Sequence, residues 1–116
     1  MSNNKKEEFS TQYKNSFQRK VKEFCELYNI KCPLEYRILD VVSELGEFVK
    51  EIIKSTNYGK DEFIFREEIK EELGDLLFSL IVVANELNIN LEEALNLVID
   101  KYKRRIEKRG TPSSTK

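Results

Sequence analysis

Apolar residues recur at every third or fourth position through most of the chain, which is the period of an amphipathic helix. In the first such stretch, near residues 5–29, the apolar positions are Phe9, Tyr13, Phe17, Val21, Phe24 and Tyr28. Pro33 suits the first turn of a second helix over residues 34–55, before the turn-forming sequence STNYGKDEF. No strand-like alternation and no internal repeat stands out, so the pattern favours helices alone.

Two further helices follow from the same pattern. The third is expected over residues 63–88, and the fourth starts after Asn90, which has a glutamate three positions later as in a capping box. Gly110 and Pro112 are stop signals just after its last residues. The sequence therefore predicts an all-α bundle of about four helices, a single domain over residues 1–109, and a disordered tail over residues 110–116.

The second helix carries an acidic stripe. Its members, spaced four, three and four residues apart, are Asp40, Glu44, Glu47 and Glu51. At about 100° per residue all four fall on one face, beside a neighbouring apolar face. An ordinary solvated helix face would show the same pattern, so this helix alone does not decide between the two interpretations.

The third helix combines acids with a strongly apolar segment. Glu72 and Asp75 share one side of it, whereas residues 76–84, LLFSLIVVA, are apolar nearly all round. A helix of that kind is buried at the centre of its bundle or in an oligomer interface. Carboxylates at the rim of such a segment must be protonated, paired with a cation or bound to a metal.

The two acidic faces together predict a metal centre. If they meet, four carboxylates converge: Glu44, Glu47, Glu72 and Asp75. Four such groups repel one another unless a divalent cation neutralises them, and ligation by oxygen alone suits Mg²⁺, with Mn²⁺ as a substitute. Residues three apart are neighbours on a helix surface, so each pair can bind an ion without distorting the backbone.

Composition narrows the function classes. The 116 residues include 20 Lys and Arg against 21 Asp and Glu, a balance that gives no reason to expect nucleic acid or a membrane as partner. The absence of histidine excludes Ser-His and Cys-His nucleophilic sites and nearly all zinc enzyme sites. Cys25 and Cys32 match neither a redox pair nor a metal knuckle, and MSNNKKEEFS lacks the apolar core of a signal peptide. We expect free thiols and a cytoplasmic protein.

The segments VVSELGEFVKE and EEIKEELGDLLFSLIVVANELNINLEEAL resemble the MazG-like members of the all-α nucleoside triphosphate pyrophosphohydrolases. The shared signature is E-x-x-E, a spacer and E-x-x-D, here Glu44 with Glu47 and Glu72 with Asp75, and the resemblance covers about residues 20–109. It implies Mg²⁺-dependent hydrolysis of a nucleoside triphosphate between the α and β phosphates, which gives a nucleoside monophosphate and pyrophosphate. It also implies a homodimer or homotetramer.

Further roles follow within this hypothesis. Glu47 is the candidate to orient the attacking water or to accept its proton. Lys101, Arg104 and Arg105 on the last helix are candidates for phosphate binding, as similar family members have Lys and Arg there, although cations near a helix C-terminus are also favoured by its macrodipole. The chain departs from several relatives by having Asp100 where they have Asn, and it lacks tryptophan and the His-Pro-His ending of longer members.

Tyr13 and Phe17 are candidate stacking surfaces for the base, but a stripe of this period also occurs in an ordinary core.

Two other interpretations of the whole chain remain open from the sequence. The chain would be a non-catalytic helical interaction module if its carboxylates paired with lysines, among them Lys50, Lys54 and Lys70. It would be a nucleic-acid-binding module if KYKRR contacted phosphates, which the near-neutral charge argues against.

Overall fold

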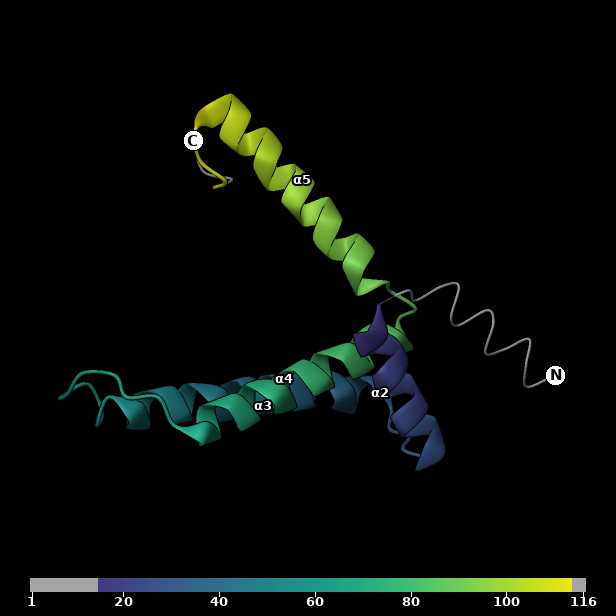
Figure 1. Cartoon of the computed structure of the whole chain (residues 1–116). Coiled ribbons are helices and arrows are strands. Elements are labelled where there is room, and N and C mark those ends of the chain that lie inside the picture. The colour runs from purple at the N-terminus through teal and green to yellow at the C-terminus, as the bar shows by residue number, and fades with distance from the viewer. Residues whose placement is uncertain (1–14, 114–116) are drawn as a thin grey trace.

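The computed structural model describes residues 15–113, and all of its regular structure in that range is helical (Figure 1). The helices are α2 (Ser16–Leu27), α3 (Leu34–Ser55), α4 (Glu67–Glu86) and α5 (Leu91–Arg109). The predicted all-α class is thus confirmed for the described residues. Tyr13, the first part of the helix expected from residue 5, and the last three residues of the expected tail lie outside them.

The ends of α3 and α5 agree with the sequence prediction. Pro33 is the residue before α3, and its fixed backbone angle suits the start of a helix. At the start of α5, the side-chain carbonyl of Asn90 accepts a hydrogen bond from the backbone N–H of Glu93 at 3.2 Å. Gly110 ends α5 in the left-handed conformation, with φ of 78°, as a glycine readily does.

The predicted starting point of α4 was wrong. Residues 63–66 are not helical, because the N–H of Ile64 donates to the carbonyl of Ser55 at 3.0 Å and holds this segment against the end of α3. Arg66, at φ −135° and ψ 150°, is the extended residue before the helix. The apolar residues of this segment continue the helical spacing, but a tertiary hydrogen bond overrides it.

α3 and α4 lie side by side as an antiparallel pair, and α2 crosses the C-terminal part of α4 (Figure 1). The core at this crossing is small. Val21 of α2 packs with Ile81 and Val82 of α4, and Phe78 and Leu91 are among the residues packed against them. The core therefore holds α2 on α4 but does not extend along the whole hairpin.

A buried glutamine joins α2 to the turn between α4 and α5. Gln18 is fully buried, and its amide N–H group donates to the side-chain oxygen of Asn85 at 3.0 Å and to the carbonyl of Ile89 at 2.7 Å. Its carbonyl accepts the N–H of Leu91 at 2.8 Å. These bonds fix the position from which α5 begins, because they hold both sides of the turn.

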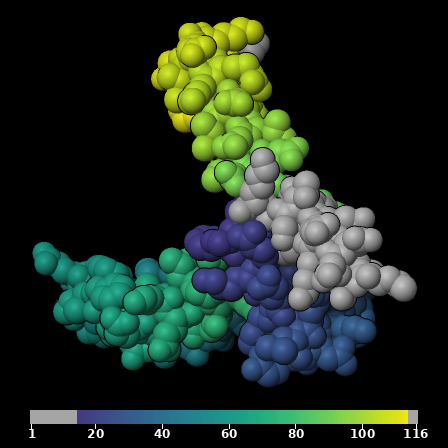
Figure 2. Space-filling model, turned by 45° about the vertical axis from the view of Figure 1, so that its right-hand side comes forward, coloured from purple at the N-terminus to yellow at the C-terminus, as the bar shows by residue number. Residues whose placement is uncertain are grey.

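α5 projects away from the α3–α4 pair, as Figures 1 and 2 show. None of its residues is buried, and the Cα radius of gyration is 18.1 Å, whereas a compact domain of this length has about 13 Å. On α4, Ile81, Val82 and Ala84 are buried, but Leu77 remains 41% exposed. The complete burial expected for residues 76–84 is therefore not reached within one chain.

Two simpler expectations concern the surroundings of the protein. Cys25 and Cys32 are both free, as expected. Among the described helices, none combines the length and the apolar character needed to cross a bilayer.

Candidate metal centre

Three carboxylates come together where α3 and α4 pack. Glu44 comes from α3, Glu72 and Asp75 come from α4, and one oxygen of each lies within 4.8 Å of one oxygen of the others. Glu44 and Glu72 are half-buried and Asp75 is exposed. The acidic faces of the two helices therefore meet at these three residues, which we call the acidic cluster.

The crowding of acids affects the pKa of Glu72. Its pKa is raised above the ordinary value, first by desolvation and then by the charges of Asp75 and Glu44, with further contributions from Glu47 and Glu51. Each of these effects disfavours the ionised form. A cation in the cluster would reverse the balance, because it would stabilise the carboxylates that now repel one another.

Glu47 is not among the three residues whose oxygens meet. It is exposed and stands about 60° from Glu44 around α3, although its charge still reaches Glu72. Glu51 lies only about 20° from Glu44, because the two are seven residues apart, and its charge also reaches Glu72. The sequence pattern included Glu51 in the acidic stripe but did not assign it to the site.

Two acids of the same stripe on α3, Asp40 and Glu51, have cationic partners, whereas the acidic cluster has none among the described residues. Asp40 pairs with Arg37 at 3.9 Å, and Glu51 pairs with Arg66 and with Lys54, at 3.7 Å for the lysine. No ion pair within residues 15–113 involves a carboxylate of the cluster. The lysine pairing that a non-catalytic module requires is thus found at Glu51 and not at the cluster.

The donor set fits a hard divalent cation. Mg²⁺ takes oxygen ligands at about 2.1 Å, so two oxygens on one ion lie at most about 4.2 Å apart. The oxygens of the cluster lie within 4.8 Å of one another, a limit slightly larger than this separation. Small rotations of these side chains, of which Asp75 is exposed, would bring the oxygens to that separation.

Comparison with known proteins identifies the family of the chain. Residues 35–110 match the family model described as the MazG nucleotide pyrophosphohydrolase domain. The chain belongs to this MazG family. The match includes α4 and both acidic motifs, so it confirms the resemblance seen in EELGDLLF.

One relative is the uncharacterized protein YpjD of Bacillus subtilis (strain 168), which is 39% identical over 74 residues. The aligned segment covers 61% of this chain and 65% of that protein, so it spans just under two thirds of the relative. No solved structure gives a significant match.

The candidate phosphate-binding residues of this MazG domain lie on α5, away from the acidic cluster (Figure 1). The amine of Lys101 lies 5.4 Å from the centre of the Tyr102 ring, and Arg105 lies 5.9 Å from the same ring and donates to the carbonyl of Pro112. Arg104 is exposed. A single chain does not bring these cations to the cluster.

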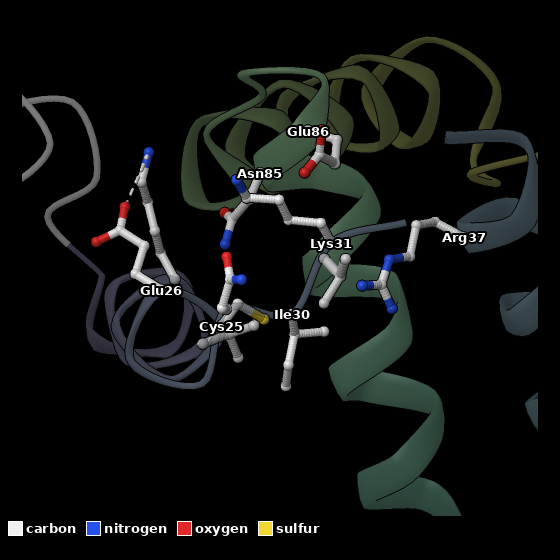
Figure 3. Close-up of a pocket in the computed structure, with 11 residues that line it drawn as sticks. Cys25, Glu26, Ile30, Lys31, Arg37, Asn85 and Glu86 are labelled. Carbon is white, nitrogen blue, oxygen red and sulfur yellow. Dashed lines mark ion pairs between the residues drawn. The ribbon is translucent and has the colours of Figure 1, made fainter. Parts of the chain in front are cut away.

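A cavity of about 340 Å³ opens between α2, the segment after it, the start of α3 and the C-terminal half of α4 (Figure 3). Its lining mixes charged, amide and apolar groups: Val21, Lys22, Cys25, Glu26, Asn29, Ile30, Lys31, Arg37, Val82, Asn85 and Glu86. Burial raises the pKa of the Cys25 thiol, and the charge of Arg37 opposes this shift. Phe17, the other candidate for base stacking, is 59% exposed and does not line this cavity.

The cavity and the acidic cluster share one side of the hairpin. Arg37 precedes Glu44 by seven residues on α3, and Val82 follows Asp75 by seven on α4. Seven residues are nearly two turns, so each pair lies on one helix face with a rise of about 10 Å between its members. The seven-residue spacing was visible in the sequence. The sequence did not show that α2 would form one wall of the cavity at the C-terminal end of α4.

Proposed function

We propose that this chain is a Mg²⁺-dependent nucleotide pyrophosphohydrolase that cleaves a ribo- or deoxyribonucleoside triphosphate between the α and β phosphates. The products are a nucleoside monophosphate and pyrophosphate. The observation that supports this most is the cluster of Glu44, Glu72 and Asp75, which has no cationic partner among the described residues, in a chain of the MazG family. A surface face of this kind would gain nothing from three crowded acids without a cation.

The acidic residues take distinct roles in this proposal. Glu44, Glu72 and Asp75 would hold Mg²⁺, or Mn²⁺ in its place, which when bound offsets the charge on phosphate oxygens and lowers the pKa of water. Glu47 is exposed and one turn from Glu44, outside the cluster. Its carboxylate is therefore available to orient the attacking water and to accept its proton.

We assign the nucleoside part of the substrate to the cavity. Its volume of about 340 Å³ is within the usual range for small-ligand sites, about 300–1,000 Å³. Asp75 and Val82 lie on one face of α4 with a rise of about 10 Å between them. A nucleotide whose phosphates reach the acidic cluster would therefore extend its base and sugar along the groove toward α2.

We further propose that the chain acts as a homodimer or homotetramer. Exposed apolar residues line the side of the α3–α4 hairpin opposite the acidic cluster, among them Val42, Leu45, Val49, Leu73, Leu77 and Leu80. An apolar face of this extent on both helices is typical of an interface. α5 also leaves Leu95 and Ile106 exposed. A second copy would bury these surfaces.

Assembly would also give the cations of α5 a role. Lys101, Arg104 and Arg105 stand away from the acidic cluster of their own chain, so we assign them to the β and γ phosphates of a substrate bound by a neighbouring copy. There they would stabilise the negative charge of the leaving pyrophosphate. Tyr102, between two of these cations, would limit their side-chain freedom.

A panel of common and damaged nucleoside triphosphates, assayed for pyrophosphate and monophosphate in Mg²⁺, tests the proposal. We expect at least one of them to give equal amounts of the two products, and we expect Asp75→Asn to abolish the reaction. Asp40→Asn is the matched control, because Asp40 is an acid of the same hairpin that pairs with Arg37. Release of inorganic phosphate in place of pyrophosphate, or full activity in Asp75→Asn, would refute the proposal.

A further inference from the structure

Arg66 ties the start of α4 to the end of α3. Its Nε donates to the hydroxyl of Ser55 at 3.0 Å. One terminal nitrogen of its guanidinium donates both to the backbone carbonyl of Glu51, at 3.1 Å, and to the Glu51 carboxylate. Ser55 is 6% exposed, and its hydroxyl donates to the same Glu51 carbonyl at 2.9 Å. We call this bonded group of Arg66, Glu51 and Ser55 the Arg66 clasp.

The clasp joins the two helices on the loop side of the acidic cluster, beside the hydrogen bond from Ile64 to Ser55. Glu51 follows Glu44 by seven residues on α3, and Arg66 precedes Glu72 by six on α4, so each side is about 10 Å from the cluster along its helix. At its other end, α4 is held by α2 through the core around Val82. Along α4, the cluster lies between the clasp and this core.

The clasp also binds an acid whose charge reaches the cluster. The Glu51 side chain is only 13% exposed, and its charge reaches Glu72. The Arg66 guanidinium binds that carboxylate from across the helix pair, with a planar group that donates several bonds in fixed directions. Glu51 is therefore held toward Arg66 and not toward the three oxygens of the cluster.

We propose that Arg66 is a positioning residue of the metal centre. Through the clasp it sets the separation of α3 and α4 at which Glu44 meets Glu72 and Asp75, and it keeps Glu51 out of the ligand set. The proposal rests on the metal site of the proposed function. Groups that orient metal ligands from outside usually change metal affinity about 10- to 100-fold when they are removed.

The sign of the effect separates positioning from charge. If Arg66 acted only as a nearby cation, its removal would strengthen the binding of another cation to these acids. Positioning predicts the opposite. We expect Arg66→Gln to bind Mn²⁺ about tenfold more weakly than the wild type, and Arg66→Lys, which keeps the charge but not the planar fork, to be weakened as well.

Lys54→Gln is the matched control. Lys54 lies 3.7 Å from the same Glu51 carboxylate, but both residues belong to α3, so this pair does not join the two helices. Its removal takes away a similar charge without loosening the hairpin. We expect Mn²⁺ to bind Lys54→Gln as tightly as the wild type, or more tightly.

Two measurements on the purified full-length chain complete the test. The Mn²⁺ affinity is measured by calorimetric titration, and hydrogen exchange of the metal-free protein follows the amides of residues 67–72. We expect faster exchange there in Arg66→Gln and Arg66→Lys, but not in Lys54→Gln, because only the first two open the clasp. Circular dichroism shows whether each variant folds. If an Arg66 variant does not fold, Ser55→Ala takes its place, because it removes the hydroxyl that accepts the hydrogen bond from Arg66 Nε.

The outcomes are distinct for the two proposals. A wild type that does not bind Mn²⁺ refutes the proposed metal site, and with it any role of Arg66 there. A wild type that binds Mn²⁺, together with clasp variants of equal or higher affinity, overturns the role of Arg66 and leaves the metal site standing. Weaker binding and faster exchange confined to the clasp variants support it.

Discussion

Gln18 offers a quantitative test of how this fold positions α5. The substitution Gln18→Leu replaces the polar side chain with an aliphatic one of similar size and removes every hydrogen bond of the side-chain amide. Gln18 is fully buried, and within the described residues its side chain contacts polar groups of α4, of the α4–α5 turn and of Asn15. The leucine variant therefore leaves those groups without their partner.

The expected cost follows from counting the groups left behind. Four of them lose a partner: the side-chain oxygen of Asn85, the carbonyl of Ile89, the N–H of Leu91 and the side-chain N–H of Asn15. A buried polar group without a partner costs about 1–3 kcal/mol, and because these sites are partly buried the lower part of that range applies. The sum is about 3–4 kcal/mol of unfolding free energy, which is a large share of the stability of a small domain.

Urea unfolding followed by circular dichroism measures this loss. Asn15→Ala is the control, because Asn15 caps α2 through the N–H of Gln18 and also donates to its side chain, and loss of such a cap costs about 1 kcal/mol. We expect the Gln18 variant to lose about three times as much free energy as the Asn15 variant. A loss of less than about 1 kcal/mol in Gln18→Leu would refute the inference that the hydrogen bonds of Gln18 fix the position from which α5 begins.

Three further outcomes are expected. The raised pKa of Glu72 means that its ionised form opposes folding, so in the metal-free protein Glu72→Gln should raise Tm at neutral pH. This gain should vanish as the pH falls below 4.5, the ordinary pKa of a glutamate, because the carboxyl is then protonated in the folded and the unfolded state. An equal gain at pH 7 and at pH 4 would contradict this. Val42→Asp places a charge on the exposed apolar side of α3, so sedimentation should show the 13.7 kDa single chain, whereas the wild type sediments as a multiple of that mass; identical sedimentation would argue against this interface. Lys101→Ala and Arg104→Ala should each lower kcat/KM about 10- to 100-fold, the equivalent of one charge-assisted hydrogen bond, with Mn²⁺ binding unchanged, and a loss of metal binding would place these residues elsewhere.

The elements predicted best were those with local signals. The bounds of α3 follow from Pro33 and the turn sequence after Ser55, and the start of α5 follows from the Asn90 cap. α4 was predicted to begin too early because Phe63 continues the apolar spacing. The hydrogen bond from Ile64 to Ser55 that keeps this segment out of the helix joins residues nine apart in the chain, and helical periodicity does not encode it.

The acidic cluster was predictable in part. Spacing on two helices brought Glu44, Glu72 and Asp75 to the correct faces, and the structure brings these three together. It could not separate Glu47 from Glu51, because both belong to one stripe and their reach toward α4 depends on how the helices are rotated against each other. Arg66, which holds Glu51, gave no periodic signal because it lies in an extended segment.

The cavity and the direction of α5 could not be predicted. Both depend on how α2 crosses α4, which the bonds of Gln18 help to fix. A single polar residue in an apolar stripe has no pattern that names its partners. The exposed apolar side of the hairpin has the same origin, because periodicity shows that a face is apolar but not whether the same chain or another one covers it.

A calorimetric titration with Mn²⁺ tests whether the acidic cluster is a metal site. We expect the wild type to bind Mn²⁺, and we expect Asp75→Asn, which loses one carboxylate of the cluster, to bind it at least about tenfold more weakly. Asp40→Asn, in which the lost acid is the partner of Arg37, should bind Mn²⁺ as the wild type does. No binding by the wild type, or equal affinity in Asp75→Asn and the wild type, would show that the acidic cluster does not hold the metal.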